Sequence, residues 1–126
     1  MTILVVDASL TVRMKIHDLL EEVDSQNIEI ECFEDASEAL EYTKENDVDL
    51  MFSGIETEGL DGVTFVDMIL RDDPKFVSKM FIVTSQKDTE HFEDIKGVGA
   101  KRFIKKPINE EYFKHFVIPE INKILR

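Results

Sequence analysis

Short apolar runs alternate along the chain with segments in which apolar residues recur every three or four positions. Three of these runs are continuously apolar, which is typical of strands buried on both faces of a parallel sheet. Another run alternates apolar with acidic residues, as a half-exposed strand at the edge of a sheet does. Together with a short final run, the pattern predicts strands over residues 3–6, 28–32, 48–53, 80–83 and 103–104.

A helix is expected after each of these strands. Each of the five helices begins with a side chain whose oxygen can accept a hydrogen bond from the free N–H groups of the first turn. The expected capping residues are Ser9, Asp35, Asp61, Asp88 and Asn109. Pro74 should end the third helix, and Pro119, inside the last helix, should kink it, because proline lacks a backbone donor and clashes with the preceding turn.

Five strands that alternate with five helices predict an α/β protein with a parallel sheet. Right-handed crossovers and the edge position of strand 28–32 favour the flavodoxin-like order 2-1-3-4-5, a (βα)5 three-layer sandwich. Ligands of such sheets bind beyond the carboxyl ends of the strands, so any chemistry is expected there. The residues at those ends are Asp7 and Ala8, Gly54, Thr84 and Ser85, and Lys106 and Pro107.

The length fits one compact domain spanning residues 1–126, because such a chain can bury a core without disulfides or metal. No apolar run approaches the roughly 20 residues of a membrane helix, and no basic leader precedes the first strand, so we expect neither membrane insertion nor a signal peptide. The single cysteine, Cys32, cannot form an internal disulfide, which suits the reducing cytoplasm. We expect Cys32 to be a small buried hydrophobe and not a nucleophile.

Charge is distributed unevenly along the chain. There are 27 acidic and 15 basic side chains and a net charge of -12, which makes nucleic acid a poor partner. Residues 1–63 hold 17 acidic and 3 basic side chains, whereas residues 64–126 hold 10 acidic and 12 basic ones. One interpretation is a solvated acidic surface. The other is that the C-terminal half, with Lys105 and Lys106, docks an acidic partner.

Four short motifs stand in a characteristic order and spacing. They are Ile3-Leu4-Val5-Val6-Asp7, Leu60-Asp61-Gly62, Ile82-Val83-Thr84-Ser85 and Phe103-Ile104-Lys105-Lys106-Pro107. On these motifs the whole chain resembles the receiver domain of bacterial response regulators, and in length it resembles the single-domain regulators of chemotaxis. The resemblance implies a cytoplasmic signalling module of a two-component phosphorelay, not an enzyme, with a histidine kinase or a downstream signalling protein as its partner.

In that family an aspartate at the end of the third strand takes a phosphoryl group from a histidine kinase, near Mg²⁺ held by two acidic residues after the first strand. A lysine and a hydroxyl contact the phosphoryl group, and an aromatic residue on the fifth strand moves with that hydroxyl. By resemblance, Asp7 is the first acidic residue, Thr84 the hydroxyl, Phe103 the switch aromatic and Lys106 the lysine.

Two of the family's acidic positions have no carboxylate in this chain. The family's acceptor aspartate lies seven residues before the aspartate of the Asp-Gly pair, and that position is Gly54, which has nothing to phosphorylate. Ala8 replaces the second acidic residue, and Thr57 and Glu58 replace the usual Met-Pro. Several changes together favour a natural loss of phosphorylation. The alternative is an ordinary phospho-accepting response regulator that carries an engineered substitution at position 54.

The remaining pocket residues lead to further expectations. Asp7 is the only acidic residue left by position, so Mg²⁺ should bind weakly or not at all. The Glu56 side chain either reaches back into the pocket or, as an ordinary loop glutamate, faces solvent. Lys106 needs a counter-charge and should pair with Asp7, the alternative being that it extends to water. The Lys106–Pro107 peptide bond is expected to be cis, as in the family.

We therefore expect a receiver-like binding module that is not phosphorylated and acts by protein–protein contact through the last strand and its flanking helices. Without a phosphoryl group, its intrinsic conformational equilibrium or a partner would set its activity. A flavodoxin-like nucleotide or flavin binder is the alternative of another class. That function needs a glycine- or hydroxyl-rich phosphate loop after the first strand, and residues 7–11 lack the glycines.

Overall fold

The computed structural model describes residues 1–24, 27–85 and 88–126. Its centre is a sheet of five parallel strands in the order β2-β1-β3-β4-β5, as predicted. The strands are β1 (Thr2–Val6), β2 (Glu29–Phe33), β3 (Leu50–Gly54), β4 (Met80–Thr84) and β5 (Phe103–Lys105). Each of them overlaps the segment that the hydrophobic pattern predicts.

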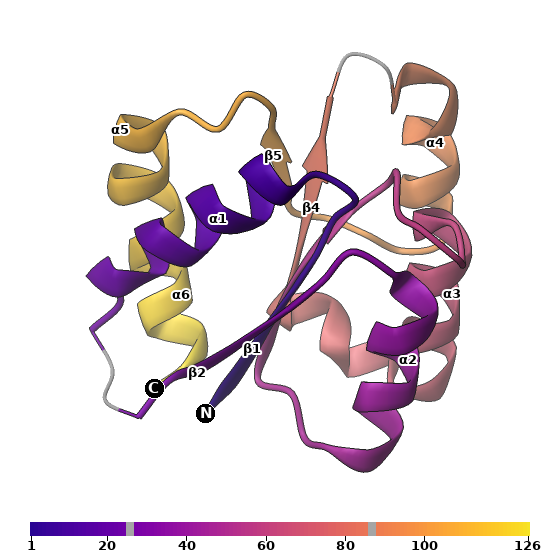
Figure 1. The fold of residues 1–126 in the computed structure, drawn as a ribbon, viewed down its shortest axis with the longest axis horizontal. Helices are drawn as coiled ribbons and strands as arrows, with labels where there is room; N and C mark the ends of the chain where they lie inside the picture. Colours follow the sequence, from indigo (N-terminus) through magenta and orange to yellow (C-terminus); the bar gives the residue numbers. More distant parts are fainter. Residues whose placement is uncertain (25–26, 86–87) are drawn as a thin grey trace.

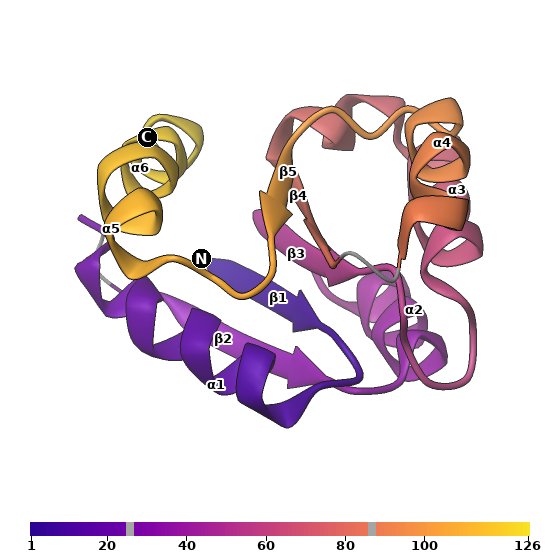
Figure 2. The same ribbon diagram turned by 90° about the horizontal axis from the view of Figure 1, so that it is seen from above.

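Helices cover both faces of the sheet, which gives the three layers seen in Figures 1 and 2. One face carries α1 (Leu10–Leu19), α5 (Glu110–Tyr112) and α6 (Ile118–Ile124). The opposite face carries α2 (Ala36–Glu45), α3 (Gly62–Asp72) and α4 (Thr89–Gly97). The flavodoxin-like α/β sandwich is therefore confirmed. Over the described ranges, no helix combines the length and the apolar character that a membrane span requires.

The central strands contribute alternate residues to two cores, one on each face of the sheet. Ile3 and Val5 of β1 pack with α1 and the last helix, whereas Leu4 and Val6 pack with α2 and α3. All four side chains are fully buried. Because successive side chains of a strand point to opposite faces, only a continuously apolar strand can fill both cores.

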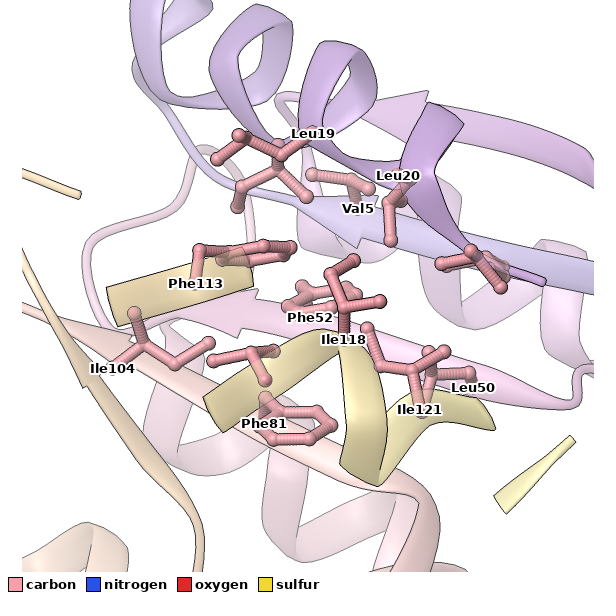
Figure 3. Packing of buried hydrophobic residues seen from close by; sticks show 14 of the residues in the cluster. Val5, Leu19, Leu20, Leu50, Phe52, Phe81, Ile104, Phe113, Ile118 and Ile121 are labelled. Carbon is pink, nitrogen blue, oxygen red and sulfur yellow. The ribbon is translucent and has the colours of Figure 1, made fainter. Parts of the chain in front are cut away.

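Aromatic rings lie at the centre of the core shared by α1 and the last helix. Phe52 of β3 stacks on Phe81 of β4 and on Phe113, with ring centroids 5.2 and 6.0 Å apart. Figure 3 shows these rings packed with Leu19 of α1 and Ile121 of α6. Stacked and offset rings add to the stability that their buried area supplies. Helix α1, from the N-terminal part of the chain, and the last helix, from the C-terminal part, therefore pack on the same strands.

Four of the predicted helix caps are confirmed by hydrogen bonds. The capping side chains are Ser9, Asp35, Asp61 and Asn109. Asp88 lies at the start of α4, as predicted, but its side chain does not cap that helix. Its Oδ2 instead accepts hydrogen bonds from the backbone N–H and the hydroxyl of Ser85, at 2.6 and 3.1 Å. The Asp88 carboxylate therefore joins Ser85, directly after β4, to the start of α4 and leaves that helix without a side-chain cap.

The two prolines expected to affect helices, Pro74 and Pro119, each lie where regular α-helix is interrupted. Pro74 follows the end of α3 and begins a 3₁₀-helix, Pro74–Lys79, which the hydrophobic pattern does not predict. Near Pro119 the last helix contains a π-helical turn, Phe113–Val117, in which a backbone N–H donates to the carbonyl five residues earlier. This wider turn stands where the kink is expected, since proline cannot donate to the preceding turn.

The edge strand β2 corrects one prediction. The expectation that Cys32 is buried is wrong, because its side chain is exposed. It borders a shallow cavity of about 290 Å³ together with Leu10 and Met14 of α1, so α1 leaves this part of the strand uncovered. Partial desolvation nevertheless raises the pKa of the thiol above its ordinary value. A raised pKa disfavours the reactive thiolate, and that Cys32 is not a nucleophile stays a prediction.

Candidate functional site

The parallel strands run in the same direction (Figure 2), and the predicted residues lie at the carboxyl ends of four of them. Asp7 directly follows β1, Gly54 ends β3, Thr84 ends β4, and Lys106 directly follows β5. We call these four residues the strand-end site. Asp7 is 2% exposed and Thr84 is 7% exposed, so the polar groups of this site lie mostly inside the protein.

Asp7 is held at both of its carboxylate oxygens. The Ser9 N–H donates to Oδ1 at 2.9 Å, and Lys106 Nζ lies 2.8 Å from Oδ2. Among the described residues, Oδ2 accepts no hydrogen bond of favourable geometry, so the ammonium compensates it by charge more than by a directed hydrogen bond. The Lys106 side chain is 18% exposed. The expected Asp7–Lys106 ion pair is confirmed, and Lys106 does not simply extend to water.

Backbone contacts fix both members of this pair. The Asp7 N–H donates to the carbonyl of Phe33 at 3.0 Å, and Nη1 of Arg13 donates to the Asp7 carbonyl at 2.7 Å. The Lys106 N–H donates to the last carbonyl of β4 at 2.6 Å. The Lys106–Pro107 peptide bond is cis, as expected. The pair is thus built from two anchored chain segments.

Gly54 lies directly beneath the Asp7 carboxylate. A Cβ atom built on Gly54 would lie 3.5 Å from the Cβ of Asp7, 2.9 Å from its Cγ and closer still to Oδ2. The end of β3 therefore does meet a carboxylate, but one that comes from the neighbouring strand β1. This contact is not visible in the sequence, because it depends on the direction in which Asp7 turns.

A second glycine controls how closely α3 approaches the end of β3. The Gly62 N–H donates to the Ile55 carbonyl at 3.0 Å. A Cβ on Gly62 would lie 2.5 Å from the Gly54 carbonyl oxygen and 2.7 Å from Ile55 Cα, both backbone atoms that cannot give way. From the sequence, Gly62 serves only as a marker of the family's spacing. The structure shows that its missing side chain places α3 against the site.

The positions of Ala8 and Glu56 do not complete an acidic pocket. Ala8 is exposed, and its N–H donates to the Glu56 carbonyl at 3.3 Å. The Glu56 carbonyl thus already accepts a hydrogen bond from within the protein. The Glu56 side chain is exposed and lines a cavity of about 160 Å³ together with Asp61 and His91. Of the two alternatives, the solvated loop glutamate is the one observed.

The residues at this edge do not form a donor set that fits Mg²⁺. Mg²⁺ takes six oxygen ligands in near-octahedral geometry, usually with one or two carboxylates. The strand-end site offers one buried carboxylate, Asp7, which already faces Lys106. Across residues 1–24, 27–85 and 88–126, no three His, Cys, Asp or Glu side chains converge closely enough to hold a metal. Weak or absent Mg²⁺ binding remains a prediction for solution.

Thr84 stands between two cavities at the ends of β4 and β5. One, of about 460 Å³, is lined by Thr84, Ser85, Asp88, Phe92, Glu93, Lys105 and Lys106. The other, of about 470 Å³, is lined by Thr84, Phe92, Phe103, Lys105, Pro107, Asn109 and Tyr112. We call the second the aromatic groove. The half-buried Phe103 ring packs on Phe92 with centroids 4.9 Å apart, so the expected switch aromatic forms part of the groove wall.

An exposed aromatic pair borders the aromatic groove and was not singled out from the sequence. Tyr112 is 47% exposed and Phe116 is 64% exposed, and their ring centroids lie 5.1 Å apart. Phe113 and Val117, one position further along, are buried. The signal was present, since residues four apart share one face of a helix.

Solved structures share this fold at low sequence identity. A signal receiver domain of an HD domain-containing protein from Pseudomonas fluorescens superposes with a TM-score of 0.78 and 21% identity, covering 98% of this chain and 93% of that one. A response regulator receiver domain protein from Clostridium thermocellum gives 0.74 and 23%, covering 99% and 98%. The receiver domain of NtrX from Brucella abortus gives 0.75 and 24%, covering 94% and 97%. No curated protein matches the chain by sequence.

A family model agrees with this likeness. The model of the response regulator receiver domain matches residues 3–117, nearly the whole chain. The strand order, the strand-end positions of Asp7, Thr84 and Lys106, and the packing of α3 on Gly62 are consistent with that match. The chain therefore belongs to the response regulator receiver domain family of two-component signalling.

Proposed function

We propose that residues 1–126 form one receiver-like signalling domain that is not phosphorylated and acts through protein–protein contact. The observation that carries the proposal is the end of β3, where Gly54 has no side chain and Asp7 occupies the space above it. A chemotaxis-like receiver with a degenerate acceptor position is the form that fits these residues.

The chemistry of the site supports the absence of phosphoryl transfer. A carboxylate nucleophile must present a free oxygen to the incoming phosphorus atom. The carboxylate nearest to Gly54 is that of Asp7, which is 2% exposed and engaged by Ser9 and Lys106. The charge of the transferred group also needs a divalent cation and positive groups around it. Here Lys106 is already neutralised, and the donor set for Mg²⁺ does not fit.

The contact surface is the aromatic groove with the aromatic pair beside it, formed by β5, α4 and the last helix. Interface cores are enriched in aromatic residues, and an exposed apolar patch with a polar rim is typical of a docking site. Tyr112 and Phe116 supply the patch, and the exposed Lys105 supplies a charge at the rim that suits an acidic partner. A histidine kinase or a downstream signalling protein is the partner class that this family suggests.

Without a phosphoryl switch, the population of the signalling state is set in another way. A phosphoryl group shifts a receiver only because it binds two conformations unequally. In its absence either the intrinsic equilibrium or the affinity of the partner for one conformation determines the output. The output of the proposed module would therefore depend on its concentration and on the fraction of it that is free to bind the partner.

Mass spectrometry of the intact protein tests the proposal. The protein is incubated with a small-molecule phosphodonor and Mg²⁺, alongside a phospho-accepting receiver domain as the positive control. We expect no adduct on this chain while the control gains about 80 Da, the mass of one phosphoryl group. A stable, stoichiometric gain of that mass on an aspartate of this chain would disprove the proposal.

A further inference from the structure

We infer that Gly54 is a structural requirement of the Asp7–Lys106 pair: the missing side chain makes the space in which the Asp7 carboxylate lies, and the pair then closes the strand-end site from within. The inference deepens the proposed function and rests on it, because it describes how a receiver-like module without an acceptor is held in one arrangement. On this inference, Gly54 does more than stand where the family has its nucleophilic aspartate: its lack of a side chain makes room for the Asp7 carboxylate.

The first argument is steric. All three atoms nearest to a Cβ built on Gly54 belong to the Asp7 side chain, and its Cγ would lie 2.9 Å away. Real Cβ atoms essentially never approach another heavy atom under 3.0 Å. Backbone conformation is not the obstacle, since the positive φ angles among the described glycines are those of Gly59 and Gly99. The obstacle is the Asp7 carboxylate.

The second argument is that Asp7 cannot move aside at little cost. Its Oδ1 accepts from the Ser9 N–H at the start of α1, and its Oδ2 faces Lys106 Nζ at 2.8 Å. The Asp7 residue is 2% exposed and the Lys106 side chain 18% exposed, so rotating the carboxylate away would leave a partly buried ammonium without its counter-charge. A side chain at position 54 and the present Asp7 conformation therefore exclude each other.

The third argument concerns charge. One buried carboxylate and one ammonium make the strand-end site neutral as it stands. A second carboxylate at position 54 would share that single ammonium, and like charges at contact distance disfavour the ionised form of both groups. A phosphoryl group would add still more negative charge. The self-neutralised pair thus disfavours the anions and the cation that an open receiver pocket would hold.

The pair also links two strands that are not neighbours. β3 and β4 lie between β1 and β5, and Lys106 additionally donates its backbone N–H to the last carbonyl of β4 at 2.6 Å. Lys105 and Pro107, on either side of Lys106, line the aromatic groove. The shape of that groove is therefore tied to an internal ion pair, in the place where an ordinary receiver would use a phosphoryl group.

A double-mutant cycle on thermal unfolding tests the inference. The proteins compared are the unchanged chain, Gly54→Ala, Asp7→Ala and their combination. We expect Gly54→Ala to lower Tm by about 5 °C or more in the unchanged chain, through overpacking. In the Asp7→Ala background, where the space is open, the same change should lower Tm by less than about 1 °C or raise it. Equal losses in both backgrounds, or no loss in the unchanged chain, overturn the inference.

Gly97→Ala is the matched glycine control. Nothing lies within 4 Å of a Cβ at that position, so its Tm should stay the same or rise. If Asp7→Ala alone fails to fold because Lys106 loses its partner, Asp7→Ala with Lys106→Met supplies an uncharged background for the same comparison. Asp7→Asn keeps the shape of the side chain, so the loss from Gly54→Ala should persist there. If Gly54→Ala does not lower Tm in the Asp7→Asn background, the steric argument is contradicted.

The two tests fail independently of each other. The cycle reports on packing and gives no information about phosphorylation, whereas the mass measurement reports on phosphorylation alone. An additive cycle without an adduct removes the inference and leaves the proposed function standing. A coupled cycle with an adduct on the unchanged chain removes the proposed function and shows that the Gly54–Asp7 packing has another purpose.

Discussion

Lys106 Nζ lies 2.8 Å from Asp7 Oδ2 and so connects the residue after β5 with the residue after β1, across β3 and β4. By resemblance to the family, Lys106 would contact a phosphoryl group and Asp7 would help to hold a metal ion. In this chain they compensate each other. The two charged groups, whose usual ligands in the family are a phosphoryl group and a metal ion, form an ion pair with each other in this chain.

Removing one member of this pair should be costly. We expect Lys106→Met to lower the free energy of unfolding by about 3 kcal/mol, at the lower end for a broken buried pair because the lysine side chain is still 18% exposed. Urea unfolding followed by circular dichroism measures this. Lys101→Met is the control, since Lys101 is exposed and makes no ion pair within the described part of the chain. A loss of the same size in both variants would contradict the role of the pair.

Restoring the acceptor alone should not restore phosphorylation. Gly54→Asp puts a carboxylate at the end of β3, but Asp7 occupies that space and Ala8 still lacks the second acidic group. We expect no phosphoryl adduct on this variant with a small-molecule phosphodonor and Mg²⁺. Gly54→Asp combined with Ala8→Asp is the companion variant. A stoichiometric adduct on the single variant would favour the alternative of an engineered substitution in an otherwise ordinary regulator.

Mg²⁺ should leave the strand-end site unchanged. A site with one carboxylate that faces an ammonium cannot supply the oxygen ligands that this cation needs. In an amide NMR titration we expect no saturable shifts at Asp7, Gly54 and Lys106 below millimolar Mg²⁺. Titration with K⁺ at matched ionic strength separates binding from general salt effects. Saturation at sub-millimolar Mg²⁺ confined to those three amides would contradict this account of the pocket.

Two phenylalanines in the last helix should respond very differently to truncation. Phe113 is fully buried and stacks on Phe52, so Phe113→Ala should cost about 3–5 kcal/mol of stability. Phe116 is 64% exposed, so Phe116→Ala should change stability by less than about 0.5 kcal/mol. Chemical denaturation measures both. A large loss from Phe116→Ala would mean that this ring supports the fold and is not held ready for a partner.

The cap of α3 should make a pH-dependent contribution. Hydrogen bonds from the Thr64 N–H and hydroxyl hold the pKa of Asp61 below its ordinary 3.8. A lowered folded-state pKa means that the stabilisation is present above the unfolded pKa and is lost as the pH falls through the folded one. Asp61→Ala should therefore cost about 1 kcal/mol at neutral pH and progressively less below pH 3.8. Unfolding curves at several pH values measure this difference.

Asp47→Ala is the control for that series. Asp47 is exposed and has no hydrogen bond or ion pair within the described residues. Its substitution should change stability by less than about 0.5 kcal/mol, as an exposed side chain without partners does. A difference between Asp61→Ala and the unchanged chain that stays constant into acid would show that the carboxylate charge is not what caps the helix.

Much of this architecture is predictable because local patterns decide it. A continuously apolar strand such as Ile3–Val6 has to be buried on both faces, which requires helices on both sides of a parallel sheet. Capping by Asp35 and Asn109 depends on the few residues that follow each of them, so it can be read directly from the chain. The convergence of Asp7, Gly54 and Lys106 follows from strand order alone.

What the sequence could not supply depends on contacts between distant segments. Cys32 alternates correctly with its neighbours, but alternation does not say whether a helix covers an edge strand. Asp88 has the right position for a cap, yet its carboxylate turns to the nearby Ser85 instead. Whether Asp7 turns over Gly54 or away from it depends on a side-chain rotation, which no spacing rule encodes.

The π-helical turn Phe113–Val117 changes the phase of the last helix. Each α-helical residue advances the chain by about 100° around the axis, so an unbroken α-helix would carry the residues after this turn away from the side that Phe113 occupies. The wider turn absorbs one additional residue and returns Ile118 and Ile121 to the sheet. Consequently one residue could be lost from this turn, which would make it an ordinary α-helical turn, while the later apolar side chains keep their orientation.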